Sequence, residues 1–348
     1  MLRRLFAFMF LCCAGCSAGK IDELRVLQLN IWGDARVVPG AFDALADELA
    51  RLDAHVVALC EVNNHAGVTS ERLVEALKER GQTWYGASGR CTGVQGTDVC
   101  VLSKYPIEEI VTGLSTFPGG VDMKVRIDVE GYDVLLYPAH LDYTHYACYL
   151  PRGYDGVTWR KLSAPESDPE AVLRMNRAST RDEAVTAFLD EVSRERADLI
   201  LLAGDFNEPS HLDWTDATSG RWDRNGCVVP WDCSVLLYGG GFRDAYRDIY
   251  PDPATHPGFT YPSDNPAKAV DALTWAPDAD ERERIDFIYY LPGGAFAPKR
   301  AEIVGPSSSI VRSERVRESG EDRFIEPLGI WPSDHKGVLA TFEFVRKR

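Results

Sequence analysis

Polar side chains interrupt apolar stretches of this sequence at several points, and their types could support catalysis. The clearest case is LLAGDFNE at residues 201–208, where an apolar run leads directly into Asp205 and Asn207. Two positions apart on an extended strand end, these side chains project to the same side. A carboxylate there can take a proton from water, and the amide can donate to an oxyanion or orient that water. We expect Gly204 to let the backbone pass close to its neighbours.

Five other apolar stretches place carboxylates, amides or histidines in the same kind of position. They carry Asn30 in LQLNIW, Glu61 in VVALCEV, His140 and Asp142 in LLYPAHLDY, Asp286 in RIDFIYY, and Asp334 and His335 in PSDHKGV. Burying several carboxylates is unfavourable unless they meet hydrogen-bond partners or a cation. We therefore expect all six segments to converge on one site.

The chemistry of that site follows from the residue types. Three of them are oxygen donors that suit a hard cation such as Mg²⁺, which keeps waters for a substrate: Asn30, Glu61 and Asp334. The sequence has neither an HExxH motif nor a Cys/His cluster for zinc. His140 and His335 can transfer protons or donate to an anion, and Asp286 is the candidate carboxylate that orients His335. A metal, an aligned water and cationic donors together indicate phosphoester hydrolysis.

Structural roles compete with these assignments. Asp and Asn favour turns, and Asp286 could instead pair with Arg284. We expect Asp142 to have a structural role. We include Arg181 and His211, which lie near the motifs in the sequence, as candidate substrate-binding residues, with loop packing as the alternative for His211.

The elements that must position these residues are visible as apolar periodicities. Strand-length runs occur at residues 24–31, 56–60, 99–102, 123–129, 134–137, 199–203, 285–291 and 338–344. Helical patterns cover 42–52, a segment capped by Ser70, and a segment that opens at Asp168-Pro169 and continues through Val192. This order of elements favours a layered α/β or α+β domain.

Two long stretches, 143–166 and 208–279, lack periodicity but hold five of the eight tryptophans. Long loops in compact domains are usually functional or disordered, and the aromatic content predicts order. We expect these loops either to line a substrate cleft or to form a second small core.

Composition bounds the class of protein. The chain has 45% hydrophobic and 26% charged residues, which is typical of a globular protein. A net charge of −15 gives no sign of a basic nucleic-acid-binding surface. A nuclease is not excluded, because a bound divalent cation can supply the local positive charge.

The N-terminal segment indicates export. Arg3 and Arg4 precede an apolar run at 5–12 that is too short to span a bilayer. The following LCCAGCS resembles a bacterial lipobox, in which Cys16 would be diacylated; an ordinary signal peptide cut nearby is the alternative. We predict a lipoprotein signal peptide at residues 1–15, a short tether at 16–22 and one catalytic domain at 23–348.

Export would permit disulfides among the six cysteines that follow Cys16. Cys91 with Cys100 and Cys227 with Cys233 are the preferred pairs, although the sequence does not fix the connectivity. Cys60 lies in an apolar run and is predicted to be a buried thiol.

The whole set of motifs resembles the endonuclease/exonuclease/phosphatase superfamily. The likeness runs in order through LQLNIWG, CEV, VLSKYPI, HLD, GDFN, RIDFIYY and SDHKGV, over roughly residues 24–345. GDFN with a downstream SDH is its most specific part. The resemblance implies an α+β fold of four α/β/β/α layers, with two mixed β-sheets packed face to face and helices outside. It also implies Mg²⁺- or Mn²⁺-dependent phosphoester hydrolysis by an in-line water.

Carried over by position, the resemblance assigns metal and water-handling roles. Glu61 matches the principal metal ligand, with Asn30 and Asp334 beside it. Asp205 matches the residue that positions the water, and Asn207 its partner at the phosphate.

The same likeness assigns the histidines. His335 matches the phosphate-contacting histidine, oriented by Asp286. His140 matches a second histidine found in the deoxyribonuclease-like and sphingomyelinase-like branches. Asp98 is its candidate partner.

We therefore predict a monomeric, divalent-metal-dependent hydrolase of phosphodiesters or phosphomonoesters, lipid-anchored through Cys16 in the bacterial cell envelope and facing outside the cytoplasm. A phospholipase-C-like substrate or a sugar or inositol phosphate is favoured, so the partner is a phosphorylated small molecule or a lipid headgroup. The alternatives are a secreted nuclease and a non-catalytic surface binding module.

Overall fold

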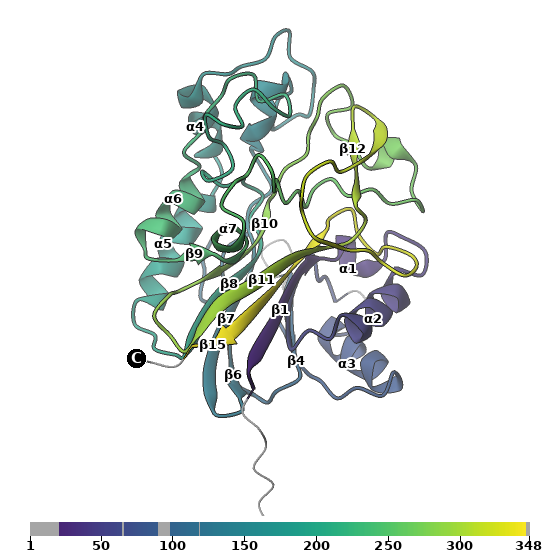
Figure 1. Cartoon of the computed structure of the whole chain (residues 1–348), viewed down its shortest axis with the longest axis vertical. Helices are drawn as coiled ribbons and strands as arrows, with labels where there is room; N and C mark the ends of the chain where they lie inside the picture. The colour runs from purple at the N-terminus through teal and green to yellow at the C-terminus, as the bar shows by residue number, and fades with distance from the viewer. Residues whose placement is uncertain (1–20, 65, 90–97, 118, 346–348) are drawn as a thin grey trace, which may run out of the picture.

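Two large β-sheets form the centre of the protein (Figure 1). The computed structural model describes residues 21–345, apart from residues 65, 90–97 and 118. One sheet has seven strands, in the order β14 (Phe324–Ile325), β11 (Phe296–Val304), β15 (Gly337–Phe344), β1 (Glu23–Asn30), β2 (Val56–Cys60), β4 (Val99–Ser103) and β3 (Tyr85–Ser88). The other has six, in the order β5 (Ile107–Thr112), β6 (Met123–Val129), β7 (Tyr132–His140), β8 (Leu199–Asp205), β10 (Asp286–Tyr290) and β9 (Arg243–Asp244).

Both sheets are mixed. The pairs β1–β2 and β7–β8 are parallel, whereas β1–β15 and β8–β10 are antiparallel. A separate two-stranded sheet is formed by β12 (Ser308–Val311) and β13 (Glu314–Arg317).

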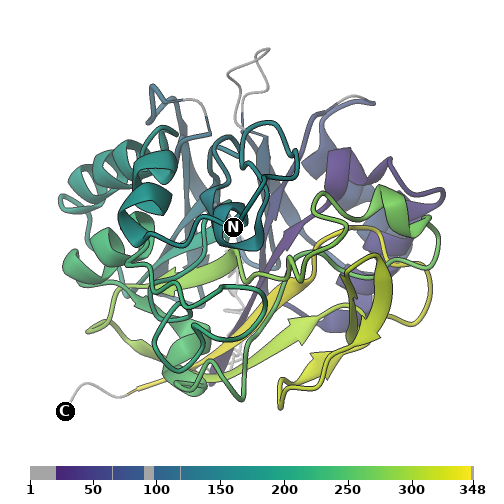
Figure 2. The same ribbon diagram turned by 90° about the horizontal axis from the view of Figure 1, so that it is seen from above.

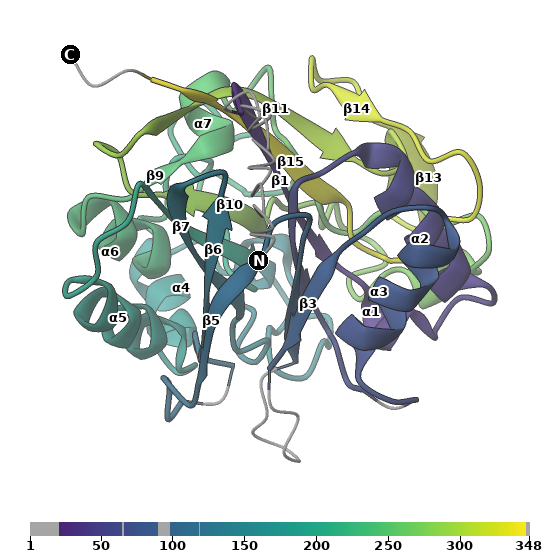
Figure 3. The same ribbon diagram turned by 90° about the horizontal axis from the view of Figure 1, so that it is seen from below.

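Helices cover the outer faces of the two sheets (Figures 2 and 3). On the seven-stranded sheet these are α2 (Ala41–Leu52) and α3 (Thr69–Glu79), and on the six-stranded sheet α5 (Arg181–Val192) and α6 (Asp232–Gly239). The shorter helical elements are α1 (Trp32–Ala35), α4 (Pro169–Asn176), α7 (Ala245–Ile249) and the 3-10 helices η2 (Ala147–Arg152) and η3 (Val270–Ala272).

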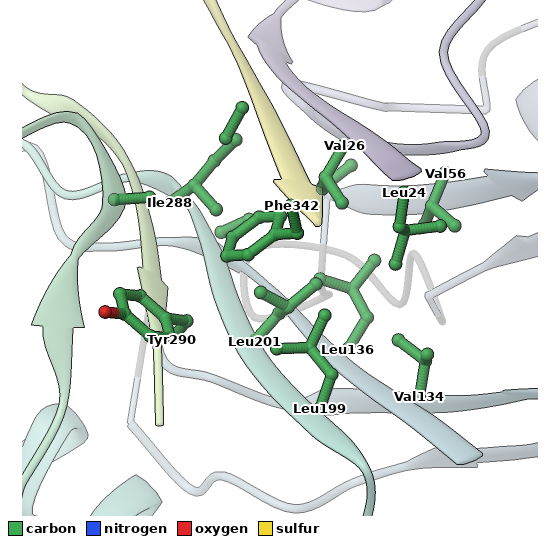
Figure 4. Close-up of a cluster of buried hydrophobic side chains, with 14 of the residues drawn as sticks. Leu24, Val26, Val56, Val134, Leu136, Leu199, Leu201, Ile288, Tyr290 and Phe342 are labelled. Atoms are coloured by element: carbon green, nitrogen blue, oxygen red, sulfur yellow. The ribbon is translucent and has the colours of Figure 1, made fainter. Parts of the chain in front are cut away.

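Side-chain alternation along the strands builds these layers. In β8, Leu199, Leu201 and Ala203 face the opposite sheet, while Ile200 and Leu202 pack toward the helices. Figure 4 shows the centre between the sheets, where side chains from both meet: Leu24, Val26, Val56 and Phe342 from one, and Leu136, Leu201 and Ile288 from the other. The predicted four-layer α+β sandwich is confirmed.

Two helix predictions are corrected by the structure. Asp168 does cap a helix, since its side chain accepts from Glu170 N at 3.3 Å, but that helix ends at Asn176 and a new one begins at Arg181. The break arises because the buried Asn176 side chain is held by both Arg181 and Glu208. Ser70 is not a cap: α3 begins at Thr69, and the side chain of Asn64 accepts from Thr69 N.

The predicted disulfide between Cys227 and Cys233 is wrong. Both are buried free thiols, and they belong to different hydrophobic clusters. Cys60 is a buried thiol, as predicted. Cys91 lies outside the described residues, so its pairing with Cys100 stays a prediction.

The two aperiodic stretches are ordered and share a core. Their aromatic residues pack in a cluster that includes Tyr146, Tyr149, Trp214, Trp231 and Tyr261. The prediction of a second small core is confirmed, and part of the same cluster also lines a cavity described below.

The predicted lipobox cysteine, Cys16, lies outside the described residues, as do the signal peptide at 1–15 and most of the tether at 16–22. These assignments stay predictions. Within the described part of the chain, no helix is long and apolar enough to cross a membrane.

Candidate active site

The polar strand ends of both sheets converge on one cavity of about 430 Å³. In the six-stranded sheet, His140 lies beside Asp205 across the parallel pair β7–β8, and Asp205 lies beside Asp286 across the antiparallel pair β8–β10. In the other sheet, Asn30 ends β1 next to the end of β2. The predicted residues that line the cavity are Glu61, His140, Asp205, Asn207, Asp334 and His335. The expected convergence is therefore present.

Gly204 makes the approach of β7 and β8 feasible. A Cβ atom at this position would lie only 1.8 Å from the carbonyl oxygen of Ala139, its register partner. Any side chain would therefore separate the two strands one residue before the point where they place His140 and Asp205 side by side.

Asp205 is the centre of the site. Its Oδ2 atom accepts from Asn30 Nδ2 at 3.1 Å, and its Oδ1 accepts from the backbone N–H of Asn207 at 2.9 Å. The Nε2 atoms of His335 and His140 lie 3.8 and 3.9 Å from Oδ2. Burial and repulsion from Asp286 raise the pKa of Asp205 to about 6, against the attraction of the two histidines.

Each histidine is oriented by its own carboxylate. His335 Nδ1 lies 2.9 Å from Asp286 Oδ2, and His140 Nδ1 lies 2.8 Å from Asp98 Oδ2. Burial by itself lowers the pKa of both imidazoles, but the neighbouring carboxylates raise each of them to about 10. Both rings are therefore cationic at neutral pH, with Nε2 directed toward Asp205.

Asp286 does not form the alternative ion pair with Arg284. Arg284 pairs instead with Asp213 and Asp244, at 2.9 and 2.6 Å. The second oxygen of Asp286 accepts from Gln28 Nε2 at 2.8 Å.

Glu61 and Asp334 have the features of cation ligands. Glu61 is held at Oε1 by Asn30 Nδ2 at 3.0 Å and at Oε2 by the backbone N–H of Gly33 at 2.6 Å. Asp334 Oδ1 is buried without a hydrogen-bond partner among the described residues. Burial and the nearby charge of Glu61 raise the pKa of Asp334 to about 7, despite attraction from His335. An unpaired buried carboxylate oxygen beside a second carboxylate fits a divalent cation.

Asn30, the third predicted metal ligand, has its amide engaged by neighbouring residues. The side-chain oxygen of Asn30 accepts from the backbone N–H of Trp32 at 2.9 Å. Its Nδ2 donates to both Glu61 and Asp205, so the amide lies between these two carboxylates. A second group, Asp205, Asp286 and His335, offers ligand atoms within 4.8 Å of one another. Because Asp286 there bonds His335, we assign that group to orientation of the histidine.

The backbone around the site is in an uncommon conformation. Trp32, Glu61 and Asn207 have φ angles of 47°, 60° and 49°. Left-handed backbone at non-glycine residues stores strain and concentrates at functional sites. Here it allows the turn after β1 to direct the N–H of Gly33 at Glu61.

Neither predicted substrate-binding residue lines the cavity. Arg181 is buried and donates to the backbone carbonyls of Asp142, Thr144 and His145, so it fixes the loop after β7. His211 bonds Ser234 at 2.8 Å and packs against a tyrosine ring. The loop-packing alternative therefore describes His211, and the carboxylate of Asp142 accepts from Thr144 N, as a structural residue does.

The sequence predicts that the aromatic loops could line a cleft, but it does not indicate which rings do so, and it does not single out one polar residue. Seven aromatic side chains line the cavity: Trp32, Tyr143, Tyr146, Tyr149, Trp159, Tyr261 and Trp275. Six of them belong to the two aromatic stretches, in which no periodicity indicates the rings that face the cavity, and Trp32 follows β1. The polar residue is Gln28, which holds Asp286. It lies two residues before Asn30 in LQLN, so the alternation of a strand places both side chains on the same side and could have indicated Gln28.

Comparison with known proteins agrees with this architecture. A family model described as "Endonuclease/Exonuclease/phosphatase family" matches residues 27–335. An uncharacterized protein of Caenorhabditis elegans is 26% identical over 339 residues, covering 96% of each chain.

Two solved structures show the same fold. A family protein from Leptotrichia buccalis and D. rerio TDP2, the latter complexed with a single strand DNA product, are each 16% identical, with TM-scores of 0.51. The likeness covers 92% of this chain in both cases, and 100% and 99% of theirs. The chain belongs to the endonuclease/exonuclease/phosphatase family, whose members are hydrolases that act on phosphoester bonds.

Proposed function

We propose that this protein is a divalent-metal-dependent phosphoesterase in which Asp205 positions the attacking water. The observation that carries the proposal is a pair of carboxylate-oriented histidines, His140 and His335, whose Nε2 atoms lie 3.9 and 3.8 Å from Asp205 Oδ2. The same cavity also contains Glu61 and Asp334. A carboxylate whose pKa lies near 6 can accept a proton from water and release it at neutral pH.

The protein groups divide the remaining work. The imidazolium Nε2 atoms of His140 and His335 would donate to non-bridging oxygens of the phosphate, on the side where Asp205 holds the water. The amide of Asn207, which donates to the carbonyl of Leu141 at 3.0 Å, has a second N–H for the phosphate. A cation held by Glu61 and Asp334, Mg²⁺ or Mn²⁺, would supply Lewis-acid stabilisation of the phosphate and of the leaving oxygen.

The substrate that we propose is a small or lipid-borne phosphoester. None of the described residues that line the cavity is lysine or arginine, and the chain carries a net charge of −15. Nucleic-acid binding depends on neutralising several phosphates with such side chains. A nuclease is the second candidate, since the similar TDP2 structure contains a single strand DNA product.

The test is hydrolysis by the purified full chain with Mg²⁺, Mn²⁺ or chelator. The panel contains an aryl phosphodiester, an aryl phosphomonoester, sphingomyelin, phosphoinositides, sugar phosphates and plasmid DNA. We expect chelator-sensitive turnover that Glu61→Gln abolishes and that Glu343→Gln, at a position outside the cavity, leaves unchanged. Full turnover in excess chelator would contradict the mechanism, and DNA cleavage without turnover of the others would favour the nuclease.

We also propose export and lipid anchoring through Cys16, supported by the sequence LCCAGCS. Cys16→Ser should move the protein from the membrane fraction to the soluble fraction of the cell envelope. An unchanged membrane fraction would contradict lipidation.

A further inference from the structure

The turn that supports Glu61 is left-handed over four consecutive residues. The φ angles are 47°, 61°, 66° and 52° at Trp32, Gly33, Asp34 and Ala35. Glycine adopts this conformation at no steric cost. Aspartate adopts it more readily than most residues, but a run of such residues is unfavourable. Contacts made elsewhere in the fold must therefore hold the turn in place.

The left-handed turn directs two backbone N–H groups at one residue. The N–H of Gly33 donates to Oε2 of Glu61 at 2.6 Å, and the N–H of Asp34 donates to the backbone carbonyl of Glu61 at 2.7 Å. Glu61 itself has a φ angle of 60° and is the first residue after β2. The turn thus helps to fix both the backbone and the carboxylate of this proposed metal ligand.

Asp34 also contacts the far end of the segment that follows Glu61. Its side chain is fully buried, and Oδ1 accepts a hydrogen bond from the hydroxyl of Thr69, the first residue of α3. Oδ2 lies 3.6 Å from Nη1 of Arg72, about one turn further along that helix. The guanidinium packs over the ring of Phe42, with 4.1 Å between its central carbon and the ring centroid. We call the contacts of Asp34 with Glu61, Thr69 and Arg72 the Asp34 clamp.

The contacts of Asp34 are few for a buried carboxylate. In the described part of the chain, Oδ2 of Asp34 and Nη1 of Arg72 are both buried without a hydrogen-bond partner. A buried ion pair of this kind repays little of the free energy lost on burial. The left-handed backbone adds a second unfavourable contribution at the same residue. Features that are unfavourable for stability concentrate at functional sites, and this one lies next to a proposed metal ligand.

We propose that Asp34 is a positioning residue for the metal site. It holds the left-handed turn against the start of α3 and so keeps the N–H of Gly33 directed at the Glu61 carboxylate. Asp34 does not line the cavity, so it acts on the metal ligand only through the turn. This inference rests on the proposed function for the metal, but the state of the turn can be measured without a metal.

The first experiment measures Mn²⁺ binding by the full chain without substrate, from the electron paramagnetic resonance signal of free Mn²⁺. Asp34→Ala should raise the Kd roughly tenfold or more, because residues that orient metal ligands contribute roughly 10- to 100-fold to affinity. Asp34→Asn keeps an acceptor for the Thr69 hydroxyl and tolerates the left-handed backbone, so its Kd should lie within about threefold of the wild type. Equal Kd values in Asp34→Ala and the wild type would overturn the proposal.

Two further variants separate the clamp from a general loss of stability. Asp53→Ala is the matched control, since Asp53 also has a left-handed φ angle, of 53°, and also pairs with an arginine, but lies outside the cavity at the end of α2. It should leave the Kd unchanged. Thr69→Val removes the hydroxyl that donates to Asp34, should raise the Kd several-fold, and carries the test if Asp34→Ala does not fold. A Kd that Thr69→Val leaves unchanged, or that Asp53→Ala raises as much as Asp34→Ala does, would overturn the clamp.

Hydrogen–deuterium exchange separates this inference from a failure of the proposed function. Exchange of the backbone amides of Gly33 and Asp34, measured with chelator present, reports on the turn without metal. We expect exchange to be roughly tenfold faster in Asp34→Ala and Thr69→Val than in the wild type, and unchanged in Asp53→Ala. If the wild type binds no Mn²⁺ but exchange responds in this way, the proposed function fails at its metal and the clamp stands. Exchange that is equally slow in Asp34→Ala and the wild type would overturn the clamp, whatever the result with Mn²⁺.

Discussion

Two buried charged clusters of this protein differ in what burial does to their carboxylates. In the active site, Asp205 and Asp334 have pKa values raised to about 6 and 7, because burial exceeds the attraction of the histidines. In the second cluster, which we call the arginine network and define as Asp213, Asp244, Arg247 and Arg284, burial also raises the pKa of Asp213, but Arg247 and Arg284 reverse the shift. Similar burial is therefore accompanied by opposite shifts of the carboxylate pKa values.

The difference lies in how completely the charges are paired. Asp213 accepts from Arg247 Nε at 2.6 Å and from Arg284 Nε at 3.0 Å, and Arg284 also reaches Asp244 at 2.6 Å. In the active site, Asp334 has a buried oxygen without a partner among the described residues. A fully paired cluster holds the loops on the six-stranded sheet, whereas an incompletely paired cluster can bind something else.

The same isosteric change in both clusters should have the largest and most contrasting effects. Asp205→Asn keeps the shape of the side chain but removes the base, so kcat should fall by roughly 10²- to 10⁴-fold. The free energy of unfolding should not decrease above pH 6, because burial already disfavours the charged form of Asp205. Steady-state kinetics and urea denaturation at pH 8 measure the two quantities. Activity within threefold of wild type would remove Asp205 from the reaction.

Asp213→Asn should do the reverse. It leaves two buried arginines facing a neutral amide, which should lower the free energy of unfolding by about 3–5 kcal/mol. The folded fraction should retain kcat within about twofold, because Asp213 does not line the cavity. Urea denaturation measures the loss of stability, and kcat measured at urea concentrations below the unfolding transition reports on the folded fraction. A loss below about 1 kcal/mol would mean that the arginine network contributes little to stability.

This contrast also explains which features were predictable from the sequence. Asp205, Asn207 and His335 end or flank apolar strands, so the strand pattern locates them without knowledge of the fold. Asp98 directly precedes the apolar run at 99–102, and only the family resemblance names it as the candidate partner of His140. The structure shows the contact, with Asp98 Oδ2 2.8 Å from His140 Nδ1. A contact between residues 42 positions apart depends on tertiary packing that local periodicity does not encode.

Arg181 lies close to the motifs in the sequence but does not line the cavity. Its place in the sequence predicts a cation that binds the substrate, yet its two terminal nitrogens donate to the carbonyls of one loop and to the Asn176 side chain. Proximity in sequence did not indicate which groups were already satisfied. The same reason accounts for the predicted helix that breaks between Asn176 and Arg181, since buried side-chain hydrogen bonds override local helix propensity.

Mg²⁺ should increase the free energy of unfolding through the active site and not through the arginine network, and without metal this free energy should depend on pH. Without metal, Asp205 and Asp334 bind protons in the folded state at pH values where the unfolded chain has released them, so stability should fall between about pH 4 and pH 7. Mg²⁺ at pH 8 should restore it, by about 2.7 kcal/mol at a concentration of 100 times Kd. Thermal unfolding with and without Mg²⁺ measures the shift. Asp334→Asn should abolish the Mg²⁺ effect and Asp213→Asn should preserve it; a Mg²⁺ effect that survives in Asp334→Asn would place the metal elsewhere.

The smallest effect should come from separating the two histidines within the active site. Asp98 holds His140 from a position that is one-third exposed, whereas Asp286 holds His335 in full burial. Asp98→Asn should lower the pKa of His140 from about 10 toward its ordinary value. The imidazole of the variant should therefore lose its charge at a lower pH than that of the wild type. We expect a roughly tenfold loss of kcat/KM at pH 8 that is recovered below pH 6, where the imidazole is protonated again. A pH profile of the variant parallel to that of the wild type would show that the cationic form of His140 is not needed, and would leave His335 as the histidine that donates to the phosphate.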